Sequence, residues 1–240
     1  GAFATCTLFC IFSFILVLNI KTVSYGSMDK SESALGNFFA GLRFIYSHSL
    51  VLPLMITVFL HCCLTMSFES LLPVLSEGFF SDGGVGATYL MMSVGTGALI
   101  LVLAIAGVKN LKLRGRFLLI TAVFSGLGSV LLGIAPTVEI ALLGCFVMGG
   151  SQAAYMAISG AVVQMSAPDY MRGRVMSVYL WHIGGMMAIV NLVNAALADS
   201  LGAPLLLIIG GGLFTVAAIA SLLKRGLKDL YLTGRVTDIS

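Results

Sequence analysis

The sequence predicts an all-α membrane protein with seven hydrophobic helical spans. Hydrophobic residues make up 59% of the 240 residues and charged residues only 10%, whereas a soluble domain usually carries about 25% charged residues. So few charges cannot cover this much apolar surface in water, and we expect the lipid bilayer to surround it. Transmembrane strands are not expected, because they would be about 10 residues long and would alternate polar with apolar residues.

The apolar runs have the length that a membrane-crossing helix needs. Each run approaches or exceeds the roughly 20 residues that cross the hydrocarbon core. Glycine and other small residues recur inside the runs, as in helices that pack closely in lipid. The predicted spans are residues 3–20, 50–74, 86–107, 117–135, 139–165, 173–198 and 203–223.

The region between the first two spans has two parts. Residues 21–34 are the most polar stretch of the chain and predict a flexible cytoplasmic linker. Residues 35–47 predict a short amphipathic helix at the membrane interface, because their apolar residues fall on one face. That apolar stripe consists of Leu35, Phe38, Phe39, Leu42 and Ile45.

The basic residues set the expected orientation in the membrane. If the spans alternate in direction, all thirteen Lys and Arg residues fall on one side. The loops on the other side hold Glu77, Asp82, Glu139 and Asp199 and no basic residue. Under the positive-inside rule the basic side is the cytoplasm. We therefore expect a multi-pass protein of the cell (inner) membrane with a cytoplasmic C-terminus.

Several other kinds of site are not expected. The five cysteines lie in predicted spans as small apolar residues. Neighbouring helix positions point about 100° apart, so His61-Cys62-Cys63 does not predict a metal site. A Walker A sequence is absent, which disfavours ATP-driven transport. We expect no cofactor and no nucleic-acid partner.

The first residues do not have the pattern of a signal peptide. Gly1 opens directly into an apolar run, with no initiator Met and no basic region before it. This start favours a chain whose N-terminal part is absent.

The segment between the fifth and sixth spans is the most specific stretch of the sequence. Residues 164–179 read QMSAPDYMRGRVMSVY. This resembles the cytoplasmic loop between helices 10 and 11 of the major facilitator superfamily, and looks most like the branch of enterobactin exporters and macrolide-efflux-like proteins. Shorter segments resemble the same branch: GLRF at 41–44, LLP at 71–73, GVGA at 84–87 and GTGA at 95–98.

The resemblance implies a major facilitator-like C-terminal six-helix bundle plus one preceding transmembrane helix. The other helices of an N-terminal bundle of the same protein would then be a partner of this chain. The implied parts are residues 1–20 as the last helix of the N-terminal bundle, 21–49 as a cytoplasmic linker and amphipathic helix, 50–225 as the C-terminal six-helix transporter domain, and 226–240 as a cytoplasmic tail.

One family motif has only an incomplete echo in this chain. The superfamily's strongest motif lies between helices 2 and 3. A partial version of it occurs here between the third and fourth predicted spans, with Gly107 and residues 114–116, Arg-Gly-Arg. Leu111 replaces the expected acid, so the resemblance implies no charge-relay role for this loop.

Ionisable groups within a span are costly in lipid, so they are candidates for function. His61 lies near the middle of the second span and Glu69 near its outer end, with Thr65 four residues from each. This spacing predicts one polar stripe along a helix. We predict that His61, which ordinarily titrates near physiological pH, couples transport to protons together with Glu69. The alternative is a histidine bonded to a backbone carbonyl and a glutamate among the headgroups.

Two further groups of polar residues are candidates for a site. Gln152 and Tyr155 share a face of the fifth span, and Asn191 and Asn194 lie in the sixth. Amides facing lipid are costly, so these four predict either a substrate cavity or contacts between helices. The loop residues Asp169, Arg172 and Arg174 predict either a cytoplasmic gate or a helix cap with basic membrane anchors.

The predicted function is that of a secondary active transporter and not of an enzyme. We expect proton-coupled efflux of a small amphipathic compound, a siderophore or a drug, by alternating access. Its partners would be the small-molecule substrate, protons and membrane lipids. The alternatives are a seven-helix receptor or retinal protein and an intramembrane enzyme. No lysine lies inside a span to bind retinal, and the sequence shows no paired acids or metal-ligand set.

Overall fold

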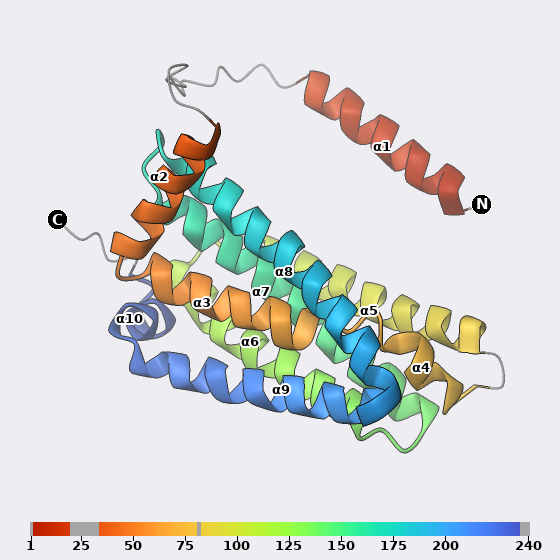
Figure 1. Ribbon diagram of the computed structural model, residues 1–240. Coiled ribbons are helices and arrows are strands. Elements are labelled where there is room, and N and C mark those ends of the chain that lie inside the picture. The colour runs from red at the N-terminus through yellow and green to blue at the C-terminus, as the bar shows by residue number, and fades with distance from the viewer. Residues whose placement is uncertain (1, 20–33, 81–82, 236–240) are drawn as a thin grey trace. The chain divides into compact units, whose positions relative to one another are not determined.

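The computed structural model describes residues 2–19, 34–80 and 83–235 (Figure 1), and the regular structure within these ranges is entirely helical. Five helices are long and apolar enough to cross a membrane, and a sixth span results if one sharply bent helix pair is counted as a single span. The prediction of an all-α, multi-pass membrane protein is therefore confirmed. The five long helices are α5 (Gly83–Ala106), α6 (Leu111–Gly133), α7 (Val138–Ser166), α8 (Arg172–Leu201) and α9 (Ala203–Ala220).

The first helix belongs to a separate unit of the chain, residues 1–31. This helix, α1 (Ala2–Leu18), has 17 residues, is mostly apolar and contains no charged residue, and it is slightly shorter than the roughly 20 residues of a typical span. The predicted linker at 21–34 lies outside the described residues, except for the start of the next helix. Everything that follows concerns the second unit, residues 32–240.

The predicted amphipathic helix is present as α2 (Ala34–Ser47). It packs on the start of α8 so closely that a Cβ on Gly41 would collide with the backbone oxygen of Arg174. Ile45 is buried, and Phe38 packs edge-on against Trp181 at 5.9 Å between ring centroids. Leu35 and Phe39 of the predicted stripe remain exposed within this unit, so only part of the stripe meets the bundle.

The second predicted span is broken, which differs from the continuous helix expected over residues 50–74. The helix α3 (Val51–His61) continues as a π-helical turn, Cys62–Met66, and then leaves helical geometry at Ser67, with φ −85° and ψ 49°. A short helix, α4 (Leu72–Glu77), follows with Pro73 in its first turn. Proline fits an N-terminal turn because it has no N–H to donate. The helix α2 is bent by 107° relative to α3 and the π-turn.

The ends of the long helices follow from local sequence. The Asn110 side chain accepts hydrogen bonds from the backbone N–H groups of Lys112 (2.9 Å) and Leu113 (3.4 Å), which caps α6. The helix α6 thus begins six residues before its predicted start at 117. Arg114 therefore lies within its first turns. Between α8 and α9, Gly202 adopts φ 80°, which glycine allows without strain, and Pro204 follows in the first turn of α9.

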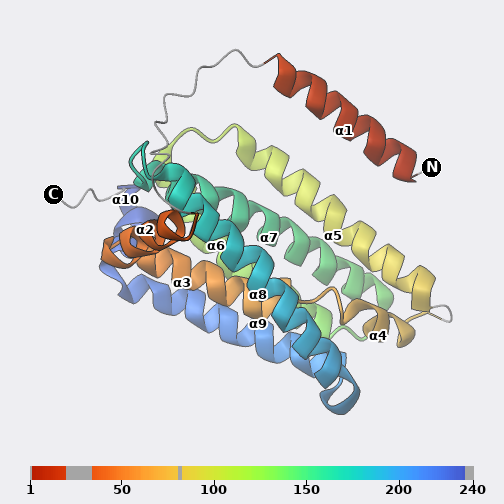
Figure 2. The same ribbon diagram turned by 45° about the horizontal axis from the view of Figure 1, so that its top comes forward.

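Glycine contacts hold the long helices close together. The helices α5 and α6 each pack extensively along α7, and α6 also packs along α9. Figure 2 shows α5 and α7 side by side along their length. Side chains at Gly97 on α5 and Gly149 on α7 would collide with the backbone oxygens of Phe146 and Val94. Small residues that let backbones approach in this way are the usual means of helix association in lipid.

The C-terminal residues form a helix that the sequence analysis did not predict. The helix α10 (Arg225–Thr233) follows a 3₁₀ turn, Ser221–Leu223, and packs back on α6. Its buried face consists of Leu227, Leu230 and Tyr231. The Tyr231 hydroxyl lies 3.0 Å from that of Ser221. Burial raises the pKa of the Tyr231 phenol above its ordinary value, although the Ser221 hydrogen bond opposes the rise.

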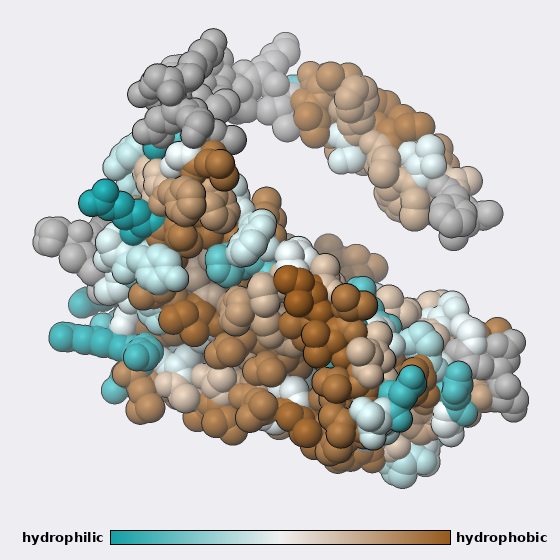
Figure 3. Space-filling view, in the orientation of Figure 1, coloured by the Kyte–Doolittle hydropathy of each residue, from teal (hydrophilic) through white to brown (hydrophobic). Residues whose placement is uncertain are grey.

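The flank of the helical bundle is apolar and its ends are polar. Figure 3 shows hydrophobic side chains along the long helices and hydrophilic ones gathered near α10 and near the α4 end. Only 11% of the most apolar window of α5 is buried within this chain, and 17% of that of α8. These exposed apolar faces need lipid or further protein to cover them.

Candidate functional site

The polar centre of the bundle is His61, at the last residue of α3. Its side chain is fully buried between the rings of Tyr155 on α7 (4.6 Å between centroids) and Phe214 on α9 (4.8 Å). Its Nε2 lies 2.9 Å from the Ser125 hydroxyl on α6. Its Nδ1 has no hydrogen-bond partner among the described residues. Three helices besides α3 therefore enclose this imidazole.

The π-turn after His61 frees backbone carbonyls that side chains then satisfy. A π-turn departs from the regular i to i−4 pattern, and groups left unpaired within a membrane are costly. The Gln152 amide on α7 donates to the Thr65 carbonyl at 2.8 Å. The Thr65 hydroxyl donates back to the His61 carbonyl at 2.9 Å and accepts from Ser125 at 3.4 Å. One buried network thus links α3, α6 and α7.

Side chains on α8 hold the next, non-helical part of the chain. The Asn194 amide donates to the Ser67 carbonyl, and Ser67 donates in turn to the Cys62 carbonyl at 2.8 Å. The Asn191 side-chain oxygen accepts from the backbone N–H of Ser70 (3.4 Å) and from its hydroxyl (3.3 Å). We call residues 62–71, the π-turn and the non-helical segment after it, the break.

The four predicted cavity residues all contact the interrupted span, either at α3 or at the break. Gln152 and Tyr155 are buried, and Asn191 and Asn194 are half-buried. Gln152, Asn191 and Asn194 bind the break directly. The Tyr155 hydroxyl donates to the Thr57 hydroxyl on α3 at 3.0 Å. Three of the four are thus engaged with the backbone of the interrupted span.

Glu69 lies apart from the His61 network. Its side chain is exposed. The predicted stripe requires a regular helix from His61 to Glu69, and the π-turn together with the non-helical Ser67 removes that regularity. The structure therefore joins His61 to Thr65 but does not extend the stripe to Glu69.

The predicted gate residues lie at the start of α8. Asp169 and Arg172 form an ion pair at 2.7 Å, with side chains 91% and 48% exposed, and Arg172 Nε also donates to the Gln164 carbonyl at 3.1 Å. Arg174 Nη1 contacts the Met171 sulfur at 3.9 Å. The ion pair is local, three residues apart, and it fixes the loop between α7 and α8.

Replacing Asp169 by Asn should change stability little. An exposed ion pair contributes about 0–1 kcal/mol because water and salt screen it. We expect the melting temperature of Asp169→Asn in detergent to stay close to that of the parent, and a double-mutant cycle with Arg172→Gln to give a small coupling energy. A large coupling energy would show that these charges are less solvated than the structure indicates.

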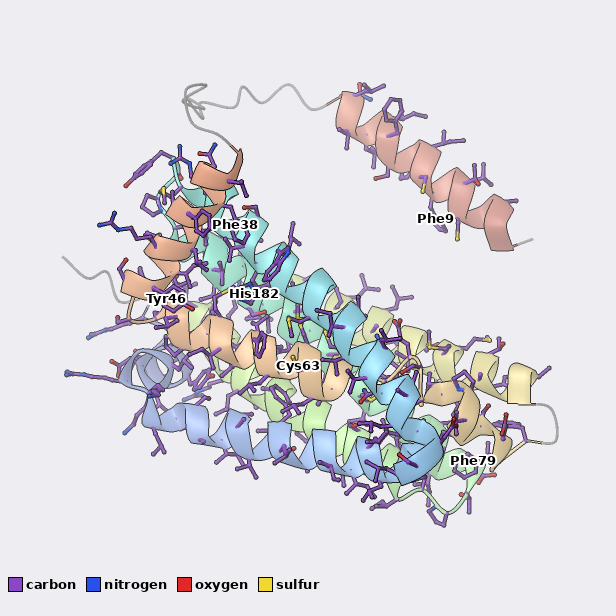
Figure 4. All side chains as sticks on the ribbon, in the orientation of Figure 1. Phe9, Phe38, Tyr46, Cys63, Phe79 and His182 are labelled. Carbon is purple, nitrogen blue, oxygen red and sulfur yellow. The ribbon has the colours of Figure 1, made fainter. Side chains whose placement is uncertain are left out.

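Two residues that the sequence analysis left aside, Trp181 and His182, flank the contact between α2, α3 and α8. His182 Nδ1 lies 2.8 Å from the Val178 carbonyl, and its ring meets Phe59 edge-on at 6.1 Å. Figure 4 marks His182 together with Tyr46 on α2 and Cys63 in the π-turn. His182 is half-buried and engaged with its own helix, so it serves below as a comparison for His61.

Sequence reasoning missed several partners in this network. Ser125 and Phe214 complete the His61 surroundings, yet a single serine or phenylalanine inside an apolar span gives no signal of its own. Ser67 and Ser70 did give a signal in the sequence, because residues 67–70 read SFES, a polar cluster inside a predicted span. No group of three or more His, Cys, Asp or Glu side chains that could hold a metal occurs in the described ranges.

Comparison with known proteins gives a family match over most of the chain. The family model described as "Transmembrane secretion effector" (MFS_3) matches residues 1–229. A curated relative, the "Multidrug efflux pump Tap" of Mycolicibacterium fortuitum, is 24% identical over 197 residues, which are 79% of this chain and 47% of that protein. The chain thus spans about half the length of this relative. No solved structure matches.

Proposed function

Because the chain belongs to the transmembrane secretion effector family, MFS_3, we propose that it is the carboxy-terminal bundle of an efflux transporter of the major facilitator type. A transporter family disfavours the receptor and the intramembrane enzyme considered from the sequence. The similar efflux pump extends well beyond the matched region, since the match covers 47% of it. In this proposal a second bundle of the same protein covers part of the exposed apolar surface of the present one.

The observation that carries the proposal is the break in the second span. Transporters commonly build their sites from discontinuous helices near the middle of the membrane, where side chains can satisfy the freed backbone groups. Here Gln152 on α7 and Asn194 on α8 both donate hydrogen bonds to backbone carbonyls of the break. If α8 moves relative to α7, these bonds must be exchanged. The break would then be the place where the bundle changes shape during alternating access.

We assign the substrate contacts to the polar residues around the break. Asn191 and Asn194 are half-buried, and a substrate that displaced Ser67 or Ser70 from them would find amide donors and acceptors. Gln152 and Tyr155 line the deeper side. The chain has 59% hydrophobic and only 10% charged residues, which suits an amphipathic substrate such as a drug or a siderophore. The name of the similar efflux pump favours a drug.

We assign proton coupling to His61, with Glu69 as the exposed group that exchanges protons with water. His61 is the one imidazole in the described chain that is fully buried, and its Nδ1 without a partner gives it a free position for a proton. In the conformation seen here Tyr155 and Phe214 enclose it, so a proton would reach it only after the bundle rearranges. In the same proposal Asp169, Arg172 and Arg174 form the gate on the cytoplasmic side of the inner membrane.

Transport measurements can test the coupling assignment. In vesicles containing the full-length transporter, we expect His61→Gln and Glu69→Gln to lose proton-driven accumulation of the amphipathic cation ethidium while still binding it. Glutamine at 61 keeps a polar group near Ser125, so the fold should survive. The matched controls are His182→Gln and Glu77→Gln, which change the same residue types outside the network.

Two results would oppose different parts of the proposal. Unchanged proton-driven accumulation in both His61→Gln and Glu69→Gln would refute the coupling assignment and leave the transporter assignment standing. Failure of the parent protein to accumulate ethidium, macrolides or siderophores under any ion gradient would refute the transporter assignment itself.

A further inference from the structure

An apolar groove runs along α7, between α5 and α6. These two helices are consecutive in the chain, but each packs along α7 and they scarcely contact each other in the described residues. Two cavities of about 280 and 270 Å³ lie between them and share Phe117 in their walls. We call the two together the α5–α6 groove. Its floor is α7, from Phe146 to Ala161.

The groove has the length and the surface for a hydrocarbon chain. Fifteen residues separate Phe146 from Ala161, which is about 22 Å along a helix and more than half of the roughly 30 Å hydrocarbon core. Ile100, Ile120 and Phe124 on its rims are each about half exposed (53%, 47% and 50%). The groove is therefore open along an exposed apolar flank of this unit, and each cavity is near the lower limit of about 300 Å³ for small-molecule pockets. A slender chain suits it better than a bulky ligand.

One cation lies at the end of this groove. Arg114 lines the cavity of about 280 Å³ and is the only charged residue in the walls of the two cavities. Its Nε donates to the Val108 carbonyl at 2.7 Å, which fixes the guanidinium against the end of α5. Its two terminal nitrogens have no hydrogen-bond partner in the part of the chain that the structure describes. They are available to an anion.

The surroundings of Arg114 are positively charged as well. Lys109, Lys112 and Arg116 are exposed, and residues 107–116 contain no acid. A basic group at the end of a membrane span attracts the headgroups of anionic lipids. Guanidinium also pairs with phosphate through two parallel hydrogen bonds.

We propose that the α5–α6 groove binds one anionic phospholipid, with an acyl chain along α7 and the phosphate at Arg114. The apolar walls of the groove suit an acyl chain. Arg114, the half-buried cation at its end, suits a negatively charged headgroup. This lipid would fill the space between two helices that scarcely contact each other and so hold α5 and α6 at a fixed separation. The proposal does not depend on what the protein transports.

Binding can be measured by native mass spectrometry of the intact chain released from detergent micelles. We compare phosphatidylglycerol with phosphatidylcholine of the same acyl chains. Arg114→Gln should weaken phosphatidylglycerol binding about 5- to 10-fold, the effect of one basic group near a charged membrane surface, and leave phosphatidylcholine binding unchanged. The matched control, Arg116→Gln, changes an exposed arginine two residues away and should have little effect. Equal losses in both variants would overturn the proposal, since only diffuse charge would then be at work.

A second pair of variants tests the acyl chain. Ala157→Phe places a large ring on the floor of the groove and should displace both lipids, whereas Ala188→Phe puts the same ring on the exposed face of α8 and should displace neither. Each variant must keep the melting temperature of the parent. Retention of lipid by Ala157→Phe would overturn the proposal, as would full displacement of phosphatidylglycerol by glycerol phosphate alone. A change of oligomeric state in Ala157→Phe without loss of lipid would instead assign the groove to a second copy of the chain.

Discussion

Valine at Gly97 should prevent α5 from packing on α7, whereas valine at Gly95 should be tolerated. A Cβ at Gly97 would collide with the Phe146 carbonyl oxygen and lie 3.1 Å from the backbone nitrogen of Gly150. Backbone atoms in the middle of a helix cannot move aside as a flexible side chain can. Overpacking typically costs about 1–3 kcal/mol where side chains can adjust, so we expect a loss of at least about 3 kcal/mol here.

Gly95 provides a matched control on the same helix. A Cβ there meets no atom within 4 Å, and both variants make the same change in intrinsic helix propensity, from glycine to the somewhat more favourable valine. Thermal unfolding in detergent, followed by the fraction of monodisperse protein, should show Gly97→Val largely aggregated and Gly95→Val close to the parent. Similar behaviour of the two variants would mean that α5 and α7 are not as close as described.

The second large effect is expected for Gln152→Leu. Leucine has nearly the same size but cannot donate to the Thr65 carbonyl, which would then be buried without a partner. An unsatisfied buried acceptor costs about 1–3 kcal/mol. Because the carbonyl belongs to the π-turn, we expect the cost to appear first as local opening of the break, seen as faster hydrogen exchange over residues 62–71, with a lower melting temperature.

Gln164→Leu is the control for that experiment. Gln164 lies on the same helix, α7, and its side chain is exposed. Its backbone carbonyl, which Arg172 uses, is unchanged by the substitution. The control should leave both exchange and melting near the parent values. Exchange over 62–71 that is equally slow in both variants would show that Gln152 does not hold the break.

The long spans could be read from the sequence because their signal is simple. A continuous apolar run between charged loops fixes a membrane helix, and α5, α7, α8 and α9 begin within about three residues of prediction. The start of α6 was missed by six residues because Lys112, Arg114 and Arg116 look like loop, whereas Asn110 caps a helix that already includes them.

The break and α10 could not be read in the same way. Hydropathy is insensitive to backbone geometry, so residues 50–74 look like one span although a π-turn interrupts them. The polar cluster at 67–70 and Pro73 hinted at the interruption, but what stabilises it is Gln152 and Asn194, which are distant in sequence. Likewise α10 is too charged to resemble a span, and its contacts with other helices, chiefly α6, bury Leu227 and Leu230.

The sequence identified which polar residues belong to the candidate site, but only partly what each of them contacts. Searching for polar groups inside apolar runs located His61, Gln152, Asn191 and Asn194, which all lie at or around the break. The search could not tell that the three amides bind backbone groups, because that depends on which backbone N–H and C=O groups the break leaves free. The stripe to Glu69 was inferred from regular helical spacing, and that spacing ends at the π-turn.

The break also has a consequence for how the chain is made. Its three amide partners are synthesised long after it, since Gln152 comes 87 residues after Thr65, Asn191 comes 121 after Ser70 and Asn194 comes 127 after Ser67. When the second span first enters the bilayer, its apolar sequence favours an ordinary continuous helix. The bonds from Gln152 and Asn194 can form only after α7 and α8 have been inserted beside the second span. These bonds to the break therefore belong to the later steps of biogenesis.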